Sequence, residues 1–341
     1  MREEPVLKVQ NLKTELYLSG RPYAVVKDVS FDLYRGKTLA IVGESGCGKS
    51  LTALSLIRVL PEPPALHPRG KIWYQGINLL DLSEKEMRKI RGGKIAMIFQ
   101  DPLSSLNPVY TIGDQLAEAA ALHLNLFGEE AYQKAEEMLN HVGIPSPKER
   151  LADYPHQLSG GMRQRVMIAQ ALISKPDVLI ADEPTTALDV TIQAQVIDLL
   201  KRLQKEDGMA ILLITHDMGV VSELADEVLV MYASEGIESG SVDEIFENKS
   251  HPYTQGLFNS RPSGSAEEGD VLHPIPGIVP QLTDYPSGCR FHPRCPFAMK
   301  KCTLNSPPLF ALGERGRHQS ACYLEDGTEE SEKMRREGRW Q

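Results

Sequence analysis

The chain has 341 residues, of which 37 are basic and 46 acidic, so its formal net charge is −9 at pH 7. Its hydrophobic content of 41% is sufficient for a sizeable core, and its length allows one large domain or two. The acidic balance argues against nucleic-acid binding through a broad basic face. The longest apolar runs, such as AILLI at 210–214, have only strand length, and MREEPVLKVQ at 1–10 has no apolar signal-peptide core. We therefore expect a cytosolic chain without a transmembrane span.

The first 60 residues predict strands followed by a helix. Short apolar segments rich in β-branched and aromatic residues alternate with turns over residues 6–42, which is typical of strands. The stretch LTALSLIRVL (51–60) has helical spacing, and the Pro-rich segment 61–70 ends it. Over residues 111–140, apolar side chains recur every three or four positions, which predicts a helical insert of two to four helices.

The middle of the chain alternates helices with buried strands. SGGMRQRVMIAQALIS (159–174) predicts a helix with Ser159 as its N-cap, and a second helix is expected over about 190–206. DVLIADEP (177–184) and GMAILLITHD (208–217) read as buried strands that end in polar residues. This order predicts an α/β fold, a parallel sheet with helices on both faces and ligands beyond the carboxyl ends of the strands.

The first motif with clear chemistry is GESGCGKS, from Gly43 to Ser50, which fits the phosphate-binding pattern G-x-x-x-x-G-K-[ST]. Its glycines let successive backbone N–H groups point into one concavity, and the following helix adds its positive N-terminal end. Lys49 is expected to reach the β- and γ-phosphates, and Ser50 to ligate Mg²⁺. A chance match in a glycine-rich turn is the alternative, but the strand TLAIV (38–42) before the motif argues against it.

Two acids complete the predicted site. Asp182 ends a hydrophobic strand, where it can hold Mg²⁺ directly or through water, and Glu183 follows as a candidate to polarise the attacking water. Hydrolysis of a γ-phosphate needs positioning, charge neutralisation and an oriented nucleophile, and two adjacent acids can divide the metal and water roles.

Taken in order, these motifs resemble those of the ABC ATPases. LSGGMRQR (158–165) is similar to their signature sequence, and IFQDP (98–102), ADEPTTALD (181–189) and ITHD (214–217) stand in the family order. The resemblance covers about residues 6–245. It implies a nucleotide-binding domain over 1–249, a P-loop core with an antiparallel β subdomain and a helical insert at about 103–165.

The resemblance also implies roles for single residues. Gln100 matches the glutamine that senses Mg²⁺, and His216 matches the switch histidine that holds the γ-phosphate and the water in line. Ser159, Gly160 and Gly161 match the signature residues that contact ATP bound to an opposite subunit, and Asp189 matches the D-loop. The nucleotide-contacting positions of the P-loop are then Gly43, Ser45, Gly46, Cys47, Gly48, Lys49, Ser50, Leu51 and Thr52.

An aromatic ring upstream of the P-loop stacks on adenine in this family. Tyr23 and Tyr17 both qualify, and we favour Tyr23, although either can be a plain strand aromatic.

The segment 250–325 resembles the C-terminal extension of ATPase subunits from oligopeptide and dipeptide ABC importers. The similar stretches are HPYTQGL, PIPGIVPQL, GCRFHPRCPFAMKKC and PPLF. The resemblance implies an ATPase that powers peptide import, although relatives with this extension also import nickel, glutathione or sugars. The final residues 326–341 are charged and are expected to form a frayed tail.

Four of the five cysteines lie in this extension, at Cys289, Cys295, Cys302 and Cys322. Disulfides are not expected in a reducing compartment, and the C-x2–4-C knuckle of zinc sites is missing. The spacing C-x5-C-x6-C-x19-C suits a [4Fe–4S] cluster better, as in the peptide-importer branch, with zinc or unliganded thiols as alternatives. Cys47, in the P-loop, is expected to fill a position for a small residue.

The resemblance implies several partners. They are a second, homologous ATPase subunit forming a heterodimer, two membrane permeases and, indirectly, a substrate-binding protein. The chain would then act peripherally at the cytoplasmic face of the plasma membrane, with residues 101–115 lining a groove for a permease helix. The rival class, a soluble ABC ATPase of DNA repair, needs long coiled-coil arms, and the sequence has no sustained heptads.

Overall fold

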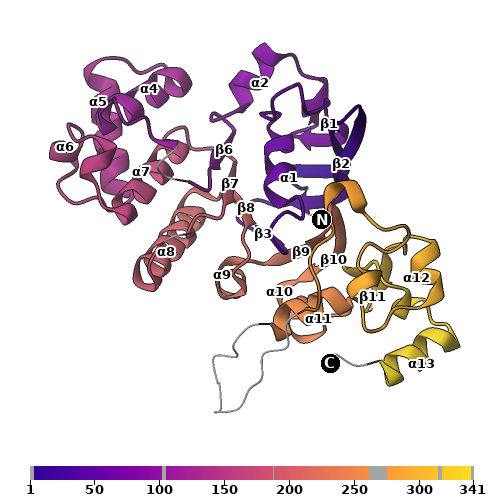
Figure 1. Cartoon of the computed structure of the whole chain (residues 1–341). Helices are drawn as coiled ribbons and strands as arrows, with labels where there is room; N and C mark the ends of the chain where they lie inside the picture. The colour runs from indigo at the N-terminus through magenta and orange to yellow at the C-terminus, as the bar shows by residue number, and fades with distance from the viewer. Residues whose placement is uncertain (1–3, 102–104, 187, 261–274, 314–316, 339–341) are drawn as a thin grey trace. The chain divides into compact units, whose positions relative to one another are not determined.

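The computed structural model describes residues 4–101, 105–186, 188–260, 275–313 and 317–338. The chain divides into two compact units (Figure 1). The first unit comprises Met1–Lys8, Asp32–Thr38 and Ile72–Thr215, and the second comprises Val9–Phe31, Leu39–Lys71 and His216–Gln341. Within the described residues, no helix combines the length and the apolar character that a bilayer crossing requires.

The first unit is built on three parallel strands, β6 (Ile95–Ile98), β7 (Val178–Asp182) and β8 (Ala210–Ile214). All five residues of β7 and of β8 are buried, as expected for parallel strands whose two faces are both covered. The register pairs Asp182 with Ile214, so the carboxyl ends of β7 and β8 lie at the same edge of the sheet. The buried strands expected around 177–184 and 208–217 are therefore confirmed.

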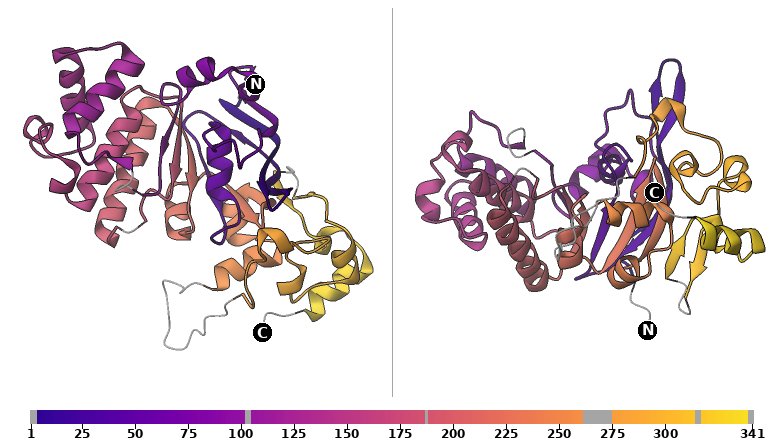
Figure 2. Two further views of the ribbon diagram at one scale, coloured as in Figure 1. Left: turned by 45° about the horizontal axis from the view of Figure 1, so that its top comes forward. Right: turned by 60° about the horizontal axis from the view of Figure 1, so that its bottom comes forward.

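Within the described residues, the region of the predicted helical insert contains a group of four helices of the first unit, drawn in magenta in Figure 1 and Figure 2, and the last of them extends beyond the expected end at 165. Their packing partners are within the group, because α4 packs against α5 and α7, and α5 against α6 and α7. Thr111 begins α4 with a capping box in which its hydroxyl accepts from the Asp114 N–H at 3.1 Å. The bounds are α4 (Ile112–Leu124), α5 (Glu129–His141), α6 (Pro147–Arg150) and α7 (Gly160–Leu172).

The first unit also contains one long helix, a small hairpin and a short helix. The helix predicted over 190–206 is α8 (Val190–Asp207), whose apolar face from Val196 to Leu203 is buried. The remaining elements are the end of β4 (Arg69–Tyr74), its antiparallel partner β5 (Ile77–Asn78) and α2 (Glu84–Ile90).

The second unit contains most of β1 (Leu7–Leu18) and β2 (Arg21–Leu33), a hairpin closed by a two-residue turn. In the same sheet, β10 (Glu235–Ser241) lies between β2 and β9 (Glu227–Tyr232), and β9 pairs in parallel with β3 (Thr38–Val42). The strands expected over residues 6–42 and the helix after them are confirmed. The helices of this core are α1 (Lys49–Leu56) and α9 (Met218–Leu224).

The C-terminal extension lies in the same unit as β3 and α1. It joins the sheet through β12 (His318–Ser320), which pairs antiparallel with β10, while β11 (Phe310–Leu312) pairs with β12. The helices that follow β10 are α10 (Val242–Glu247) before the extension, α11 (Pro252–Asn259) and α12 (Lys300–Leu304) within it, and α13 (Glu329–Glu337) after it.

The expectation of a frayed tail over 326–341 is wrong for most of that segment, because α13 occupies Glu329–Glu337. Thr328 caps the helix, which has acidic residues in its first turn and basic residues in its last, the arrangement that the helix dipole favours. Lys301 holds the start of the helix through Asp326 (2.6 Å) and Ser331 (2.8 Å), so a capped, charge-ordered helix is docked on the extension.

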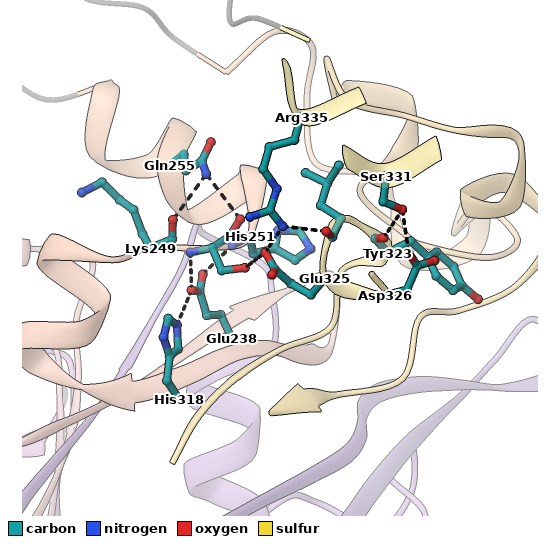
Figure 3. A network of polar contacts seen from close by, with 12 residues as sticks. Glu238, Lys249, His251, Gln255, His318, Tyr323, Glu325, Asp326, Ser331 and Arg335 are labelled. Atoms are coloured by element: carbon teal, nitrogen blue, oxygen red, sulfur yellow. Dashed lines mark hydrogen bonds and ion pairs between the residues drawn. The ribbon is translucent and has the colours of Figure 1, made fainter. Parts of the chain in front are cut away.

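A buried ion pair joins the extension to the core sheet. The carboxylate of Glu238, fully buried on β10, accepts from the Nε2–H of His318 at 2.8 Å (Figure 3). It also accepts from the backbone N–H groups of Ser250 (2.6 Å) and His251 (3.0 Å), just before α11. Burial would raise the pKa of Glu238, but these hydrogen bonds hold it below its ordinary value. The pKa of His318 is raised, because its imidazole is hydrogen-bonded to the Glu238 carboxylate.

The sign of each pKa shift sets the pH range over which this pair stabilises the fold. Glu238, with a lowered pKa, stabilises above its ordinary value of 4.5 and loses this effect as the pH falls through the folded pKa. His318, with a raised pKa, stabilises fully below its ordinary value of 6.5 and loses this effect as the pH rises through the folded pKa. The pair therefore contributes most between the two ordinary values.

We predict that His318→Gln lowers the free energy of unfolding by about 1–3 kcal/mol at about pH 6, because Glu238 loses a charged donor. The difference from the wild type should shrink toward about pH 9, as the pH rises through the folded pKa of His318 and the imidazole loses its charge. Urea unfolding at the two pH values measures both quantities. The matched control is His67→Gln, whose ion pair with Glu62 is exposed and should matter little. A deficit that is equal at both pH values would contradict the charged pair.

Candidate functional site

The P-loop has the backbone that phosphate binding requires. It begins directly after β3 and leads into α1, whose first residue is Lys49. Gly48, just before the helix, has a φ of +103°, and a Cβ there would lie 2.5 Å from the carbonyl oxygen of Val25. Only glycine fits that position. The first hydrogen bond of the helix runs from the Thr52 N–H to the Gly48 carbonyl, at 2.8 Å. In this geometry the amides of the first turn point toward the N-terminus of the helix, where an anion can bind.

Lys49 is buried and lies in the concavity of the loop. Its ammonium donates to the carbonyl oxygens of Gly43 (2.8 Å) and Glu44 (3.0 Å). These two contacts hold the Lys49 ammonium inside the loop. A bound phosphate group can replace the neutral carbonyl oxygens as the hydrogen-bond acceptor of this ammonium.

Ser45 and Gly46 form the exposed tip of the P-loop, while Cys47 is fully buried. The thiol lies under the loop with its Sγ 4.0 Å from the Lys49 Nζ, and burial raises its pKa. A buried protonated thiol is unreactive, so Cys47 fills a position for a small residue and any contact with phosphate comes from its backbone.

The acids lie at the carboxyl end of β7 in the first unit. Asp182 is its last residue and is buried. Glu183 follows with a φ of +48°, an arrangement that costs a non-glycine residue about 1–3 kcal/mol and clusters at functional sites. Its N–H donates to the Ile214 carbonyl at 2.8 Å, and its carboxylate accepts from Gln100 Nε2 at 3.1 Å and Thr186 Oγ1 at 2.8 Å.

The signature residues lie at the N-terminus of α7. Ser159 caps the helix by accepting from the Met162 N–H at 3.3 Å, and both Ser159 and Gly160 are exposed. Gly161 faces α8 so closely that a Cβ there would lie 2.9 Å from Ile192 Cγ2. Asp189 caps α8 by accepting from the Ile192 N–H at 3.0 Å. The two helix N-termini are therefore packed together.

The remaining nucleotide residues lie in the second unit. His216 is exposed and precedes α9. Tyr23 lies on β2, where the Arg21 guanidinium covers its ring at 4.7 Å from the centroid. Tyr17 is half exposed, and its hydroxyl donates to the Gly20 carbonyl at 2.9 Å.

The four cysteines of the extension converge, as their clustering in the sequence predicts. Cys289, Cys295, Cys302 and Cys322 line one enclosed cavity of about 10 Å³, together with aromatic and aliphatic side chains. The Cys289 N–H donates to the Cys302 carbonyl at 2.8 Å, which closes the segment into a loop. All are free thiols.

Burial dominates the chemistry of these thiols. It raises the pKa of Cys289 to about 11 and of Cys295 to about 12, and it raises the pKa of Cys322 further. Within the described ranges, no three His, Cys, Asp or Glu side chains are grouped as ligands of a single metal ion. A tetrahedral zinc site would draw its sulfur atoms to about 3.8 Å from one another, given Zn–S bonds of about 2.3 Å.

A hollow of about 280 Å³ lies beside β6 in the first unit. It is lined by Phe99 and Ser105 after the strand and by Gln115 and Leu122 of α4, and the side chains of Phe99 and Leu122 are exposed. Of the groove expected over 101–115, residues 102–104 lie outside the described part of the chain.

The sequence analysis missed two partners of its site residues. Thr186 is one of them, although it stands inside the motif ADEPTTALD. Tyr253 is the other, since its hydroxyl accepts from the backbone N–H of Glu44 at 2.8 Å. HPYTQGL, which contains Tyr253, marks the position, but nothing in its pattern indicates a contact with the P-loop.

Two family models match the chain. Residues 26–186 match the ABC transporter family, and residues 237–302 match the oligopeptide/dipeptide transporter C-terminal region. The dipeptide transport ATP-binding protein DppD of Bacillus subtilis is 50% identical over 323 residues, covering 95% of this chain and 96% of that protein. The oligopeptide transport ATP-binding protein OppD of the same organism is 47% identical, covering 92% and 88%.

Among solved structures, a dimeric post-hydrolysis state of the ATP-binding cassette MJ0796 bound to ADP and Pi is similar. Its TM-score is 0.61 at 28% identity, covering 69% of this chain and 98% of that one. The expected P-loop ATPase fold is confirmed. The chain therefore belongs to the ABC transporter family, among the ATP-binding proteins that carry the oligopeptide/dipeptide transporter C-terminal region.

Proposed function

We propose that this chain hydrolyses ATP to power the import of di- and oligopeptides through a membrane ABC transporter. The observation that carries the proposal is an ATPase core and a peptide-transporter extension in one chain, matched over more than nine-tenths of its length by dipeptide and oligopeptide transport proteins.

The P-loop is proposed to bind the phosphates of ATP, which its match to the phosphate-binding pattern supports. The first-turn amides of α1 and the Lys49 ammonium stabilise the negative charge of the phosphates. The hydrogen bonds from Lys49 to the Gly43 and Glu44 carbonyl oxygens keep its ammonium in the loop before ATP binds. The aromatic face for adenine is proposed to be Tyr23, with Arg21 as the side chain that must move aside. His216 is proposed to hold the γ-phosphate and the water in line.

Ser50, Asp182 and Gln100 are proposed to hold Mg²⁺. They offer hydroxyl, carboxylate and amide oxygen atoms, which are the ligands that this ion prefers. When bound, the ion neutralises charge on the phosphate oxygens.

Glu183 is proposed to orient the attacking water and accept its proton. Its carboxylate is held from two sides, by Gln100 and Thr186, and its backbone is fixed by the Ile214 carbonyl. A base held in this way needs little reorganisation when water attacks the γ-phosphate to give ADP and phosphate.

We infer that the active form contains two such ATPase chains. Ser159 and Gly160 expose a helix N-terminus that suits the γ-phosphate of ATP on an opposite subunit. The opposite subunit is proposed to be a homologous ATPase, which would make a heterodimer. ATP then joins the two chains, and its hydrolysis releases them.

The transporter partners are proposed to be two permeases, supplied with peptide by a separate binding protein. The hollow beside β6, with the exposed apolar side chains of Phe99 and Leu122, suits a short permease helix. The chain would then sit peripherally at the cytoplasmic face of the plasma membrane. The cargo of such a complex is selected by the binding protein and permeases, so nickel, glutathione or sugars remain outcomes of a transport assay.

The four converging thiols are proposed to hold a [4Fe–4S] cluster that cross-links the extension. Four cysteines around one apolar cavity supply the donors that such a cluster uses. The cavity holds about one water molecule in the thiol form, so the side chains must turn outward and lose their protons on binding. Zinc is the weaker alternative, because the C-x2–4-C knuckle that is usual in zinc sites is missing from the sequence.

We predict that Glu183→Gln retains ATP binding but lowers the rate of hydrolysis at least about 100-fold, because the amide cannot accept the proton of water. Phosphate release by the chain co-purified with its membrane partners measures the rate. Glu137→Gln, in an exposed ion pair with Lys134, serves as the control and should hydrolyse normally. Unchanged hydrolysis by Glu183→Gln would remove Glu183 from the role of base.

We predict that the protein purified without oxygen is brown and contains about four irons per chain. Cys295→Ser should lose most of the iron, whereas Cys47→Ser, whose thiol lies outside the cavity, should keep it. Iron and acid-labile sulfide assays with an absorption spectrum measure this. Colourless wild-type protein that holds about one zinc, or no metal, would reject the cluster.

A further inference from the structure

Glu44, the second residue of the P-loop, is held by side chains that come from the C-terminal extension. Its carboxylate accepts two hydrogen bonds from the Arg294 guanidinium, at 2.8 Å and 3.1 Å. Its backbone N–H donates to the Tyr253 hydroxyl at 2.8 Å. Both partners lie more than 200 residues away in sequence, yet all three belong to the second unit.

The Arg294 side chain is held in place by burial and by a hydrogen bond that does not involve Glu44. Its side chain is only 6% exposed, and its Nε donates to the Pro276 carbonyl at 2.9 Å. A bidentate guanidinium–carboxylate pair sets direction as well as distance, and burial strengthens it. The Glu44 side chain is 30% exposed, so the rigid partner is the arginine.

An aromatic cluster connects this arginine with the cysteine segment. Phe291, two residues after Cys289, packs against Tyr253 and Tyr232 with ring centroids 5.5 and 5.2 Å apart. All three rings are buried, and Arg294 immediately precedes Cys295. The segment that carries the first two cysteines is therefore packed on the residues that contact the P-loop.

A second connection runs through the turn between β9 and β10. The Ser234 N–H donates to the Cys47 carbonyl of the P-loop at 2.9 Å, and the Ser234 hydroxyl is hydrogen-bonded to the Tyr285 hydroxyl at 2.8 Å. Arg290 donates to the Ala233 carbonyl and lies over the Tyr285 ring, 4.2 Å from its centroid. The extension thus contacts the P-loop directly at Glu44 and, through this turn, at Cys47.

We propose that the extension positions the P-loop for ATP, with Arg294 as a positioning residue that acts through Glu44. This inference rests on the proposed function, since it concerns the same nucleotide site. Arg294 contacts the Glu44 carboxylate and Tyr253 the Glu44 N–H, whereas the Lys49 ammonium contacts the carbonyl oxygens of Gly43 and Glu44. The loss of Arg294 should therefore weaken ATP binding without removing the ammonium that is proposed to touch phosphate.

The test is a double-mutant cycle on the full-length chain, with equilibrium binding of the fluorescent analogue mant-ATP and Mg²⁺ as the readout. Arg294→Ala should weaken binding about tenfold, and Glu44→Gln by a similar or smaller factor. The double variant should be no weaker than Arg294→Ala alone, because the two side chains act as one pair. Arg294→Lys, which retains the charge but not the bidentate geometry, should recover part of the affinity.

Arg335→Ala is the matched control. This arginine lies on α13, which is docked on the extension, and there it pairs with Glu325 at 2.8 Å and donates to the Leu324 carbonyl at 2.6 Å (Figure 3). Its loss should lower the melting temperature and leave mant-ATP affinity unchanged.

Three outcomes would overturn the proposal. Unchanged affinity in Arg294→Ala shows that the pair is only structural, and additive losses in the double variant show that Arg294 does not act through Glu44. Equal weakening in Arg335→Ala shows general destabilisation instead. Failure of the wild-type chain to bind mant-ATP would count against the proposed function itself, so the two failures are distinguishable. Glu44→Gln, nearly the same shape as the native residue, keeps the test valid if Arg294→Ala does not fold.

Discussion

A loop that binds phosphate through its backbone amides depends largely on its carbonyl groups and side chains to hold its shape, although one of its amides, the Glu44 N–H, donates to the Tyr253 hydroxyl. This constraint explains most contacts around the P-loop. Its carbonyl groups take the Lys49 ammonium and the Ser234 N–H, and the Glu44 side chain takes Arg294. The core sheet and the extension therefore do different parts of one task, since the sheet places the loop and the extension restrains it.

The first unit also contains a residue whose conformation must be held by its surroundings. The carboxylate proposed as the base belongs to a residue with a left-handed backbone, which needs support from its surroundings. Glu183 receives that support from the end of β8 through its N–H and from Gln100 and Thr186 through its side chain. The parallel register of β7 and β8 brings Ile214 beside Asp182, so the support follows from the same sheet geometry that places the acids.

Much of the fold could be predicted because its signals are local. Periodicity located the insert and α8, and the caps at Ser159 and Asp189 follow from their residue types. The helix α13 was not predicted, because the high charge of its segment favoured the prediction of a frayed tail. Its Thr328 cap and its order of acidic residues first and basic residues last do indicate a helix. The Glu44–Arg294 pair could not be predicted, because its partners are 250 residues apart and a charged residue next to a cysteine has no distinctive spacing. The convergence of the thiols was predictable as a group, but the size of the space between them was not.

The contact between Arg294 and Glu44 also bears on how such chains can be recombined. Exchanging extensions between related transporters is a natural way to build chimaeras, and the sequence boundary near residue 250 invites a cut there. Such a cut separates a P-loop from the guanidinium and the phenol that restrain it. A working hybrid should need Glu44, Tyr253 and Arg294 from one parent, so the interchangeable part is a three-dimensional unit rather than a C-terminal tail.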